Sequence, residues 1–323
     1  MTARAKLRRL DVATMIESPP PPVPWLVEGL VVKGALTLLA GLPGQGKSLL
    51  AQALAMAATR PGGGSCAGIN VKAGHVLIID AENGEREIHR RVHALGLVAE
   101  HAQRLEVVEA EGFHLRDDLG QLEELLRAVR PDLLILDGFR SLWPVGDENK
   151  SDDVAPVLDA LRNLIRRSGC GAILIHHTGK SGQTYRGSSA IGGAAEIVFV
   201  LDTADGDDDP HRRRLRCEKC RPAPKPAPRW LRLATESDLS RGLAPIDHAD
   251  PFLAGGERAP QTASRAVDVV TVLRSRGRLT RPEIARELGF PPSDGTLRRA
   301  VERAETEGSI TRLADNRFEA CQP

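Results

Sequence analysis

The chain has 323 residues, 41% of them hydrophobic, which is enough for two domains with sizeable cores. Its 44 basic and 43 acidic residues give a formal net charge of +1, which excludes a strongly basic protein and limits any nucleic-acid affinity to local patches. The five cysteines are scattered and no apolar run approaches the roughly 18 residues of a membrane span, so we expect free thiols and a soluble cytoplasmic protein with no membrane partner.

The first 24 residues predict an arm that precedes the first domain. The opening "MTARAKLRRL" is basic, but Asp11 interrupts it before an apolar signal core develops. The stretch "ESPPPPVPW" at 17–25 favours a stiff polyproline conformation. We therefore place an N-terminal arm and linker at residues 1–24.

Strand and helix patterns alternate from residue 25 to about residue 235. Apolar runs predict buried parallel strands at 35–40, 75–80, 105–109, 132–137, 172–176 and 197–202. Helical patterns lie between them at 48–58, 85–96, 121–129 and 154–169. This alternation predicts an α/β fold with a mostly parallel sheet and helices on both faces.

The pattern changes after the last of these strands. The segment that follows predicts a hairpin with "DGDDD" as its turn, and a further strand is expected at 229–235. Residues 236–264 show no clear periodicity, so we place the first domain at 25–240 and a linker at 241–264.

Residues 265–323 predict a second, smaller domain. Short helices are expected at 266–277 and 280–289, and a third at 293–308 with Ser293 or Asp294 as N-cap. A small hairpin is expected at 309–320. Three helices followed by a hairpin resemble a winged helix.

The segment "GLPGQGKS" at 41–48 fits the phosphate-binding pattern G-x-x-x-x-G-K-S between a predicted strand and a predicted helix. Glycines let backbone amides face phosphates, and the helix N-terminus adds partial positive charge. A plain glycine turn is the alternative. We expect ATP and Mg²⁺ to be held here. The expected contacts are Gly41, Pro43, Gly44, Gln45, Gly46, Lys47, Ser48 and Leu49.

A carboxylate that ends a neighbouring strand should complete the magnesium site. Asp137 follows the apolar run "LLIL", and together with the Ser48 hydroxyl it is the expected Mg²⁺ ligand, directly or through water. A strand-end aspartate that only caps the next turn is the alternative.

Hydrolysis also needs a group that orients or deprotonates water. The residue after Asp137 is Gly138, so a glutamate is absent there, and Glu82, just beyond the strand at 75–80, is the candidate. Asp80 competes for this role but lies nearer the strand body, where a structural role is expected. An exposed loop carboxylate is the alternative for Glu82.

The strand at 172–176 leads into adjacent histidines, His176 and His177. Adjacent side chains on a strand point to opposite faces, so the two are not expected to chelate one metal ion. One of them can sense the γ-phosphate, and we favour His177 because it lies at the loop edge. A histidine satisfied in the core or at the surface is the alternative.

The glycine- and serine-rich stretch at 178–193 begins where that strand ends. It carries Lys180, Tyr185 and Arg186, and cations with one aromatic ring suit single-stranded nucleic acid. An ordinary surface loop is the alternative.

Taken together, these motifs resemble the RepA-type hexameric replicative DNA helicases, a RecA-like, AAA_25-like family of P-loop ATPases. The resemblance rests on "GLPGQGKS", "AENGEREIHRRVHALG", "LLILDGFRSLW", "SGCGAILIHHTGK" and "YRGSSAI", in family order over about residues 25–235. It implies a RecA-like P-loop core, a ring of subunits with ATP between neighbours, and movement on single-stranded DNA. It also implies that Glu82 is the catalytic base and that the histidine pair is the phosphate sensor.

One family feature is missing. In the RepA-type pattern an arginine follows "RGSS" and acts on the ATP of the neighbouring subunit, whereas here Glu196 falls near that position. The resemblance therefore implies that Lys219 and Arg221 supply the cation in trans. The alternative for this segment is half of a zinc site made by Cys217 and Cys220. We disfavour it because strand residues three apart should face opposite ways.

In the third helix of the C-terminal domain, Arg298 and Arg299 are candidate contacts for duplex DNA. Residues 265–320 hold 11 arginines against 9 acidic residues, a weak excess, so docking of a replication protein stays open.

We expect a ring-forming, ATP-driven DNA motor, a hexameric replicative helicase of a plasmid, phage or integrated element. A filament-forming recombination or repair ATPase and an ATP-switched DNA-binding regulator are the alternatives.

Overall fold

The computed structural model divides the chain into two compact units, Met1–Thr203 with Asp209–His248, and Ala204–Asp208 with Ala249–Pro323. The structure describes residues 9–96, 98–143, 151–177, 189–204, 207, 209–233, 246–248, 269–270, 272–274, 276–288, 295–306, 309–313 and 315–321.

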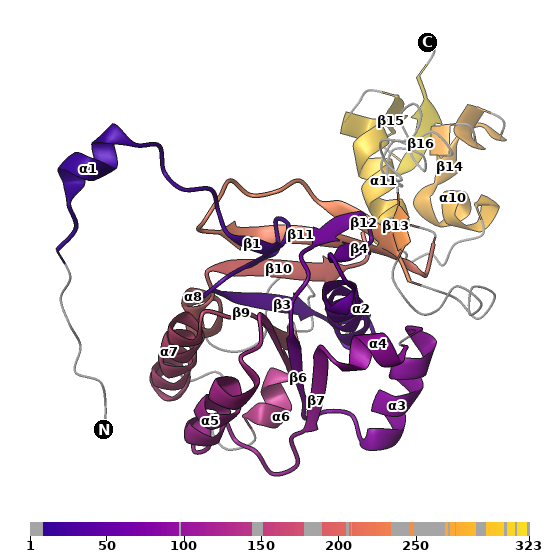
Figure 1. The fold of residues 1–323 in the computed structure, drawn as a ribbon. Helices are drawn as coiled ribbons and strands as arrows, with labels where there is room; N and C mark the ends of the chain where they lie inside the picture. Colours follow the sequence, from indigo (N-terminus) through magenta and orange to yellow (C-terminus); the bar gives the residue numbers. More distant parts are fainter. Residues whose placement is uncertain are drawn as a thin grey trace. The chain divides into compact units, whose positions relative to one another are not determined.

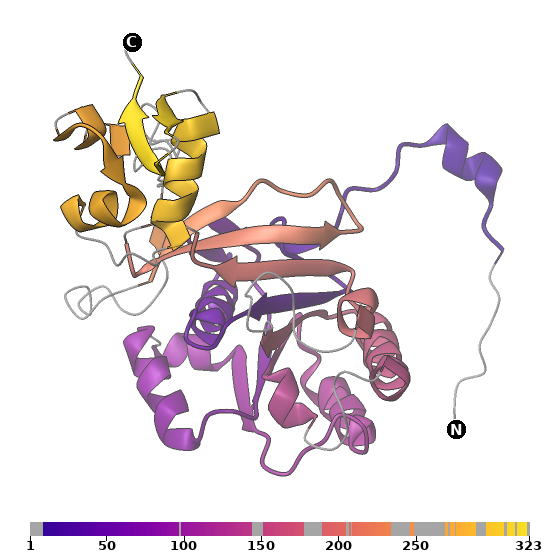
Figure 2. The same ribbon diagram turned by 180° about the vertical axis from the view of Figure 1, so that it is seen from behind.

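The first unit is built on one large sheet (Figures 1 and 2), in the order β13-β12-β11-β10-β3-β9-β8-β6-β7 within the described residues. The run from β10 to β7 is parallel, whereas β11, β12 and β13 continue the sheet antiparallel. This confirms the predicted α/β fold with a mostly parallel sheet. The strands are β3 Leu36–Gly41, β6 Val76–Asp80, β7 Leu105–Glu109, β8 Leu133–Asp137, β9 Gly171–His177, β10 Ile197–Asp202, β11 Arg212–Cys220, β12 Arg229–Arg232 and β13 Ile246–His248.

Each face of this sheet buries its own apolar core. One face is covered by α5 Leu119–Val129, α6 Phe139–Leu142, α7 Ser151–Ser168 and α8 Ser189–Ala194. The other face is covered by α2 Lys47–Thr59, which is alanine-rich and buried along most of its length because small side chains let it lie close to the sheet. With both faces covered, the central strands read as continuous apolar runs, which is why they were predictable.

Further elements surround the large sheet. A second sheet in the order β2-β1-β5-β4 joins the α2 side; its strands are β1 Trp25–Val27, β2 Val31–Val32, β4 Gly64–Cys66 and β5 Ile69–Val71. Strands of two or three residues are too short to show a period, so the sequence did not predict this sheet. The remaining helices are α1 Val12–Glu17, α3 Glu85–Ala94 and α4 Ala99–Ala102.

The segment predicted as linker contains a strand. β13 pairs with β12 through Trp230↔His248, Leu231↔Asp247 and Arg232↔Ile246, so the first unit continues to His248 rather than ending at residue 240. The strand owes its existence to backbone pairing with the edge of the sheet, and a three-residue strand leaves no periodic signal in the sequence.

A β-bulge in β11 corrects the expectation for the cysteine pair. Cys217 pairs with Phe199 and Lys219 pairs with Val198, so Glu218 is the extra residue. One extra residue reverses the alternation of faces beyond it. Cys217 and Cys220 therefore lie on the same face, both against the core on the α2 side, and not on opposite faces as predicted.

The second unit holds two of the predicted helices, α10 Arg281–Glu287 and α11 Gly295–Thr306, and a sheet in the order β14-β16-β15. Its strands are β14 Leu279–Thr280, β15 Ile310–Arg312 and β16 Arg317–Ala320. Thr280 caps α10 through a capping box with Glu283. The caps predicted at Ser293 and Asp294 lie outside the described residues, and the winged-helix interpretation stays a prediction.

Within the part of the chain that the structure describes, no helix combines the length and the apolar character needed to cross a membrane.

Candidate nucleotide-binding site

The turn between β3 and α2 forms a glycine-lined loop at the carboxyl edge of the parallel strands. Gly44 and Gly46 have φ angles of +77° and +88°, which other residues adopt only at a cost. A side chain at Gly46 would also approach the Leu233 Cδ1 to 2.8 Å. The loop opens into a cavity of ≈530 Å³. Its lining residues are Pro43, Gly44, Gly46, Lys47, Ser48, Leu49, Glu82, Asn83, Arg90, Arg91, Ile175 and His177.

The Lys47 side chain is folded back into this loop. Its ammonium donates to the carbonyl oxygens of Gly41 and Leu42, each at 2.9 Å, and lies 3.3 Å from the Nδ1 of His177. The residue is only 5% exposed, and burial lowers the pKa of Lys47, against the opposing effect of Glu82 and Asp137. A phosphate group in the loop would give this buried cation a stronger acceptor than the two carbonyl groups.

His177 links the lysine to Glu82. An ammonium group can only donate, so the His177 Nδ1 must accept from Lys47, and the neutral ring then carries its proton on Nε2. That Nε2 lies 3.4 Å from the Glu82 Oε1. The three groups thus form a chain across the cavity. A shift of the lysine toward a nucleotide would break its contact with His177 and so change the contact between His177 and the Glu82 carboxylate.

The structure places the neighbouring histidine elsewhere. His176 is 2% exposed and its ring meets that of Phe139 edge-on, with centroids 5.2 Å apart. Phe139 belongs to the core on the α7 side of the sheet, away from the cavity. Of the pair, His177 is the one that lines the cavity, and its role as a phosphate sensor stays a prediction.

Asp137 ends β8 as a buried carboxylate, 1% exposed, and neither of its oxygens makes a well-aligned hydrogen bond to any described residue. Burial raises its pKa to about 7; the Ser48 hydroxyl and Arg91 oppose the rise, whereas Asp80 and Glu82 add to it. Buried oxygens without partners, beside a serine hydroxyl, fit a bound Mg²⁺. Asp137 and Ser48 would hold that ion, which would neutralise charge on the phosphates when bound.

Gly138, which follows Asp137, makes room for Glu82. A Cβ built on Gly138 would lie 2.8 Å from the Glu82 Cδ, so a larger residue here would push the carboxylate away. This contact explains the sequence observation that no glutamate follows Asp137, because the carboxylate from β6 fills that space.

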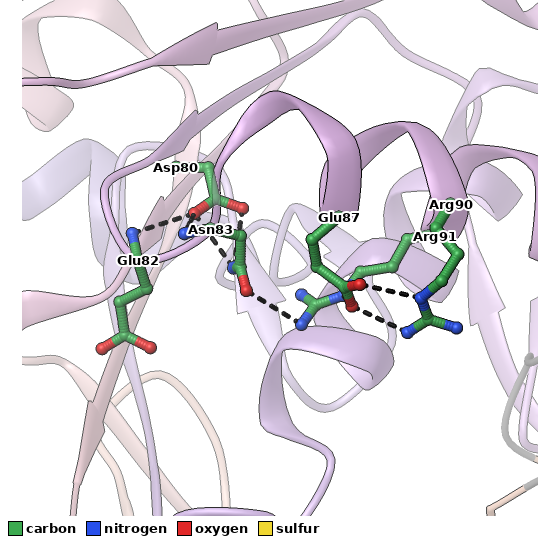
Figure 3. Close-up of polar contacts among 6 residues, drawn as sticks. All are labelled: Asp80, Glu82, Asn83, Glu87, Arg90 and Arg91. Carbon is green, nitrogen blue, oxygen red and sulfur yellow. Dashed lines mark hydrogen bonds and ion pairs between the residues drawn. The ribbon is translucent and has the colours of Figure 1, made fainter.

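A polar network holds the loop that carries Glu82 (Figure 3). The Asp80 Oδ1 accepts from the backbone amides of Glu82 and Asn83 at 3.0 and 2.8 Å, and both Asp80 oxygens accept from the Asn83 amide. Arg91 donates to Asn83 at 3.0 Å and to Glu87 at 2.7 Å. Asp80 thus has the structural role expected of it.

Sequence reasoning missed Asn83, Arg90 and Arg91 as cavity residues. Arg91 projects its buried Nη1 without a hydrogen-bond partner among the described residues, and it lines the cavity. The available signal was the spacing of four residues between Glu87 and Arg91, which puts both on one face of α3, with Asn83 a further four residues back, just before the helix begins.

Arg213 braces the phosphate-binding loop from β11, and sequence reasoning missed it too. The residue is 9% exposed, and its guanidinium donates to the carbonyl oxygens of Gln45, at 3.2 Å, and Pro210, at 2.7 Å. No motif marks this residue, because the contact joins positions 168 residues apart.

The predicted trans cations lie at the opposite edge of the sheet. Lys219 donates to the carbonyl oxygens of Gly192, Gly193 and Ala195 at 2.8, 3.2 and 2.6 Å, so its ammonium caps the C-terminal end of α8. Arg221 reaches Gly193 O at 3.5 Å. Glu196, where the family arginine was expected, accepts from the Leu36 amide at 3.0 Å and ties β10 to β3.

Of the residues predicted to contact DNA, the structure describes the side chain of Arg298 alone. Lys180, Tyr185 and Arg186 lie outside the described residues, as does the side chain of Arg299. Arg298 is exposed and pairs with Glu302 at 3.5 Å within α11.

Comparisons with known proteins agree with this architecture. A model of the AAA_25 family, described as an AAA domain, matches residues 2–183. The DNA repair protein RadA of Brucella abortus (strain 2308) is 28% identical over 207 residues, and the match covers 61% of this chain. The chain spans only 38% of the length of that relative. The KaiC-like protein PH0186 from Pyrococcus horikoshii OT3 shares the fold, with a TM-score of 0.53 and 18% identity over 69% of this chain and 94% of that one.

Asp137 makes the stability of the nucleotide-free protein dependent on pH. In the folded protein its pKa of about 7 lies above the ordinary aspartate value of 3.8, so its stabilising effect is complete below pH 3.8 and is lost as the pH rises through 7. We expect the free energy of unfolding to fall by about 2–3 kcal/mol between pH 5 and pH 8 through this group. Urea titrations without Mg²⁺ measure it, and Asp137→Asn should remove this component. Asp159→Asn, which removes an exposed carboxylate, is the control, and an unchanged slope in Asp137→Asn would contradict the assignment.

Proposed function

This chain belongs to the AAA_25 family of AAA domains, and from that premise we propose that it is an ATP-driven motor that moves on single-stranded DNA as a ring of identical subunits. Membership of this ATPase family supports ATP hydrolysis. The observation that carries the proposal is the convergence of Lys47, His177, Glu82 and Asp137 around one glycine-lined loop.

The four side chains divide the work of hydrolysis between them. The backbone amides of the loop and the Lys47 ammonium bind the phosphates, and Ser48 and Asp137 would hold a magnesium ion. Glu82 accepts the proton of the attacking water, because its side chain lines the cavity, is 29% exposed and is carried by a loop that the Asp80 network holds in place. His177 bridges the phosphate-binding lysine and this base, so it can report the presence of the γ-phosphate.

The substrate class rests on different support. The RadA relative is named a DNA repair protein, and the sequence that follows β9 contains Lys180, Tyr185 and Arg186. We propose that these three residues contact single-stranded DNA and that γ-phosphate sensing at His177 controls this contact. A hexameric replicative helicase is the favoured role; the RadA relative also favours a second candidate, a repair ATPase of the RecA type.

Arg221 is the better of the two proposed trans cations. β11 runs antiparallel to β10, so Cys220 pairs with Ile197 at the amino end of the parallel strands, whereas the phosphate-binding loop follows the carboxyl end of β3. Six strand residues span about 20 Å, so Arg221 cannot reach the nucleotide of its own chain. Lys219 is already saturated by three carbonyl groups, whereas Arg221 makes one long contact.

The C-terminal unit is proposed to be a winged-helix domain that contacts duplex DNA or a replication protein. Its support is the helix–helix–hairpin order of α10, α11 and β15–β16, and an exposed arginine on α11.

We expect Glu82→Gln to lower ATP turnover by about 10²–10⁴-fold while ATP binding is retained, because the substitution removes a proton acceptor and leaves the loop intact. Turnover should be measured with and without single-stranded DNA, and binding by calorimetry. Glu85→Gln, three residues away, is the control. Wild-type turnover that single-stranded DNA does not stimulate would sink the DNA-motor proposal but not the catalytic one.

Gly138→Ala should reproduce most of the Glu82→Gln defect, since the added Cβ displaces the Glu82 carboxylate. The matched control is Gly120→Ala in α5, where an added Cβ meets nothing within 4 Å. Turnover and ATP affinity are measured for both variants. Wild-type turnover in Gly138→Ala would show that the position of Glu82 is not critical.

Arg221→Ala should lose turnover but keep ATP binding, and it should complement Glu82→Gln. In mixed rings of the two inactive variants, some interfaces pair an intact Glu82 with an intact Arg221 from the neighbour, so part of the turnover should return. Mixtures of the purified variants at several ratios test this. If no mixture recovers activity, Arg221 does not act in trans. Lys219→Ala, which removes the α8 cap, should lower the melting temperature instead.

A further inference from the structure

The bulge in β11 brings together two cysteine side chains that the proposed function does not use. Cys217 and Cys220 pair with Phe199 and Ile197, which are two residues apart on β10 and share one face. Two strand residues span about 6.6–6.8 Å, whereas three residues of a regular strand would span about 10 Å and end on opposite faces. The bulge therefore shortens the separation and aligns the two thiols.

This separation lies at the upper end of the range that a disulfide can join, roughly 4.4–6.8 Å between Cα atoms. Both cysteines are free and half-buried, so a small oxidant can reach them, whereas Cys66 and Cys170 are buried. The Cys220 sulfur is also close enough to add to the effect of burial in raising the pKa of the Cys217 thiol. No third histidine, cysteine or carboxylate joins the pair into a metal-binding group among the described residues.

We propose that Cys217 and Cys220 form a dithiol site that a peroxide oxidises reversibly to a disulfide within the strand. One thiol gives up its proton, the resulting thiolate attacks a peroxide oxygen and the O–O bond breaks, and the hydroxide that leaves takes up that proton, so that a sulfenic acid and one water result. The second thiol then displaces the hydroxyl as a second water and forms the S–S bond. Each sulfur loses one proton and one electron, and hydrogen peroxide takes up the two protons and two electrons to give two waters.

Oxidation acts on the contact between Lys219 of β11 and the C-terminal end of α8. Lys219 lies between the two cysteines and points to the other face, where its ammonium holds three carbonyl oxygens at the end of α8. The Cys217 thiol donates to the Lys219 carbonyl oxygen at 3.3 Å, and the disulfide removes that donor. Closing the S–S bond pulls on the bulge that positions Lys219, so the α8 cap loosens. The inference does not depend on the proposed function.

Trypsin gives a direct test, because it cuts after Lys219 and separates the two cysteines unless a disulfide joins them. The full chain is treated with hydrogen peroxide, blocked with N-ethylmaleimide, digested and analysed by mass spectrometry. We expect the two peptides to stay joined, with a loss of two hydrogen atoms, until a reductant is added. The joined species should vanish in Cys217→Ser and Cys220→Ser and persist in the control Cys321→Ser.

Two results would overturn the proposal. One is recovery of the peptides as separate species, each alkylated or carried on to sulfinic acid. The other is a joined pair found only in a covalent dimer on a non-reducing gel. Hydrogen exchange of the α8 amides tests the second step: exchange should rise on oxidation of the wild type and not of Cys217→Ser, and an unchanged rate would remove the link to α8.

Discussion

A buried ammonium group is the interaction on which the site depends. Lys47 is 5% exposed, and a cation removed from water is stable only where fixed acceptors surround it. The acceptors are the carbonyl groups of Gly41 and Leu42 and the His177 ring, and the carboxylates of Glu82 and Asp137 add a favourable field. These groups come from the ends of β3, β9, β6 and β8. The parallel sheet therefore brings together the carbonyl groups, the imidazole ring and the carboxylates that surround this lysine.

Without a metal ion, the ionised form of Asp137 is unfavourable in this site. Its carboxylate is buried among other carboxylates, and its pKa of about 7 reflects burial before any other cause. Such a group is poorly placed for the stability of the empty protein but well placed to receive a divalent cation. The Asp80–Asn83–Arg91 network has the opposite character, since hydrogen bonds between its members hold the Glu82 loop without a bound ion.

The two edges of the sheet have different roles. The carboxyl edge holds the nucleotide machinery, while the amino edge carries the α8 cap, the Glu196 bond to the Leu36 amide, and Arg221. In the ring that we propose, a subunit that binds ATP at one end of the strands and presents Arg221 at the other suits head-to-tail assembly, in which the neighbour completes each site. The bulge at Glu218 lies on this second edge, so the cysteine pair and the cation pair are products of the same irregularity in β11.

The alternating α/β architecture, the phosphate-binding loop, and the placement of Asp137, Glu82 and His177 at strand ends could be predicted from the sequence. Local patterns encode these features: apolar runs, a glycine motif, and polar residues directly after them. Which of these groups meet depends on the tertiary fold. The Lys47–His177–Glu82 chain, the space at Gly138, the Arg213 brace and the saturation of Lys219 all depend on strand order and register, which join residues far apart in sequence. The cysteine pair is the sharpest case, because regular alternation puts the thiols on opposite faces and a single unpaired residue, Glu218, puts them on one.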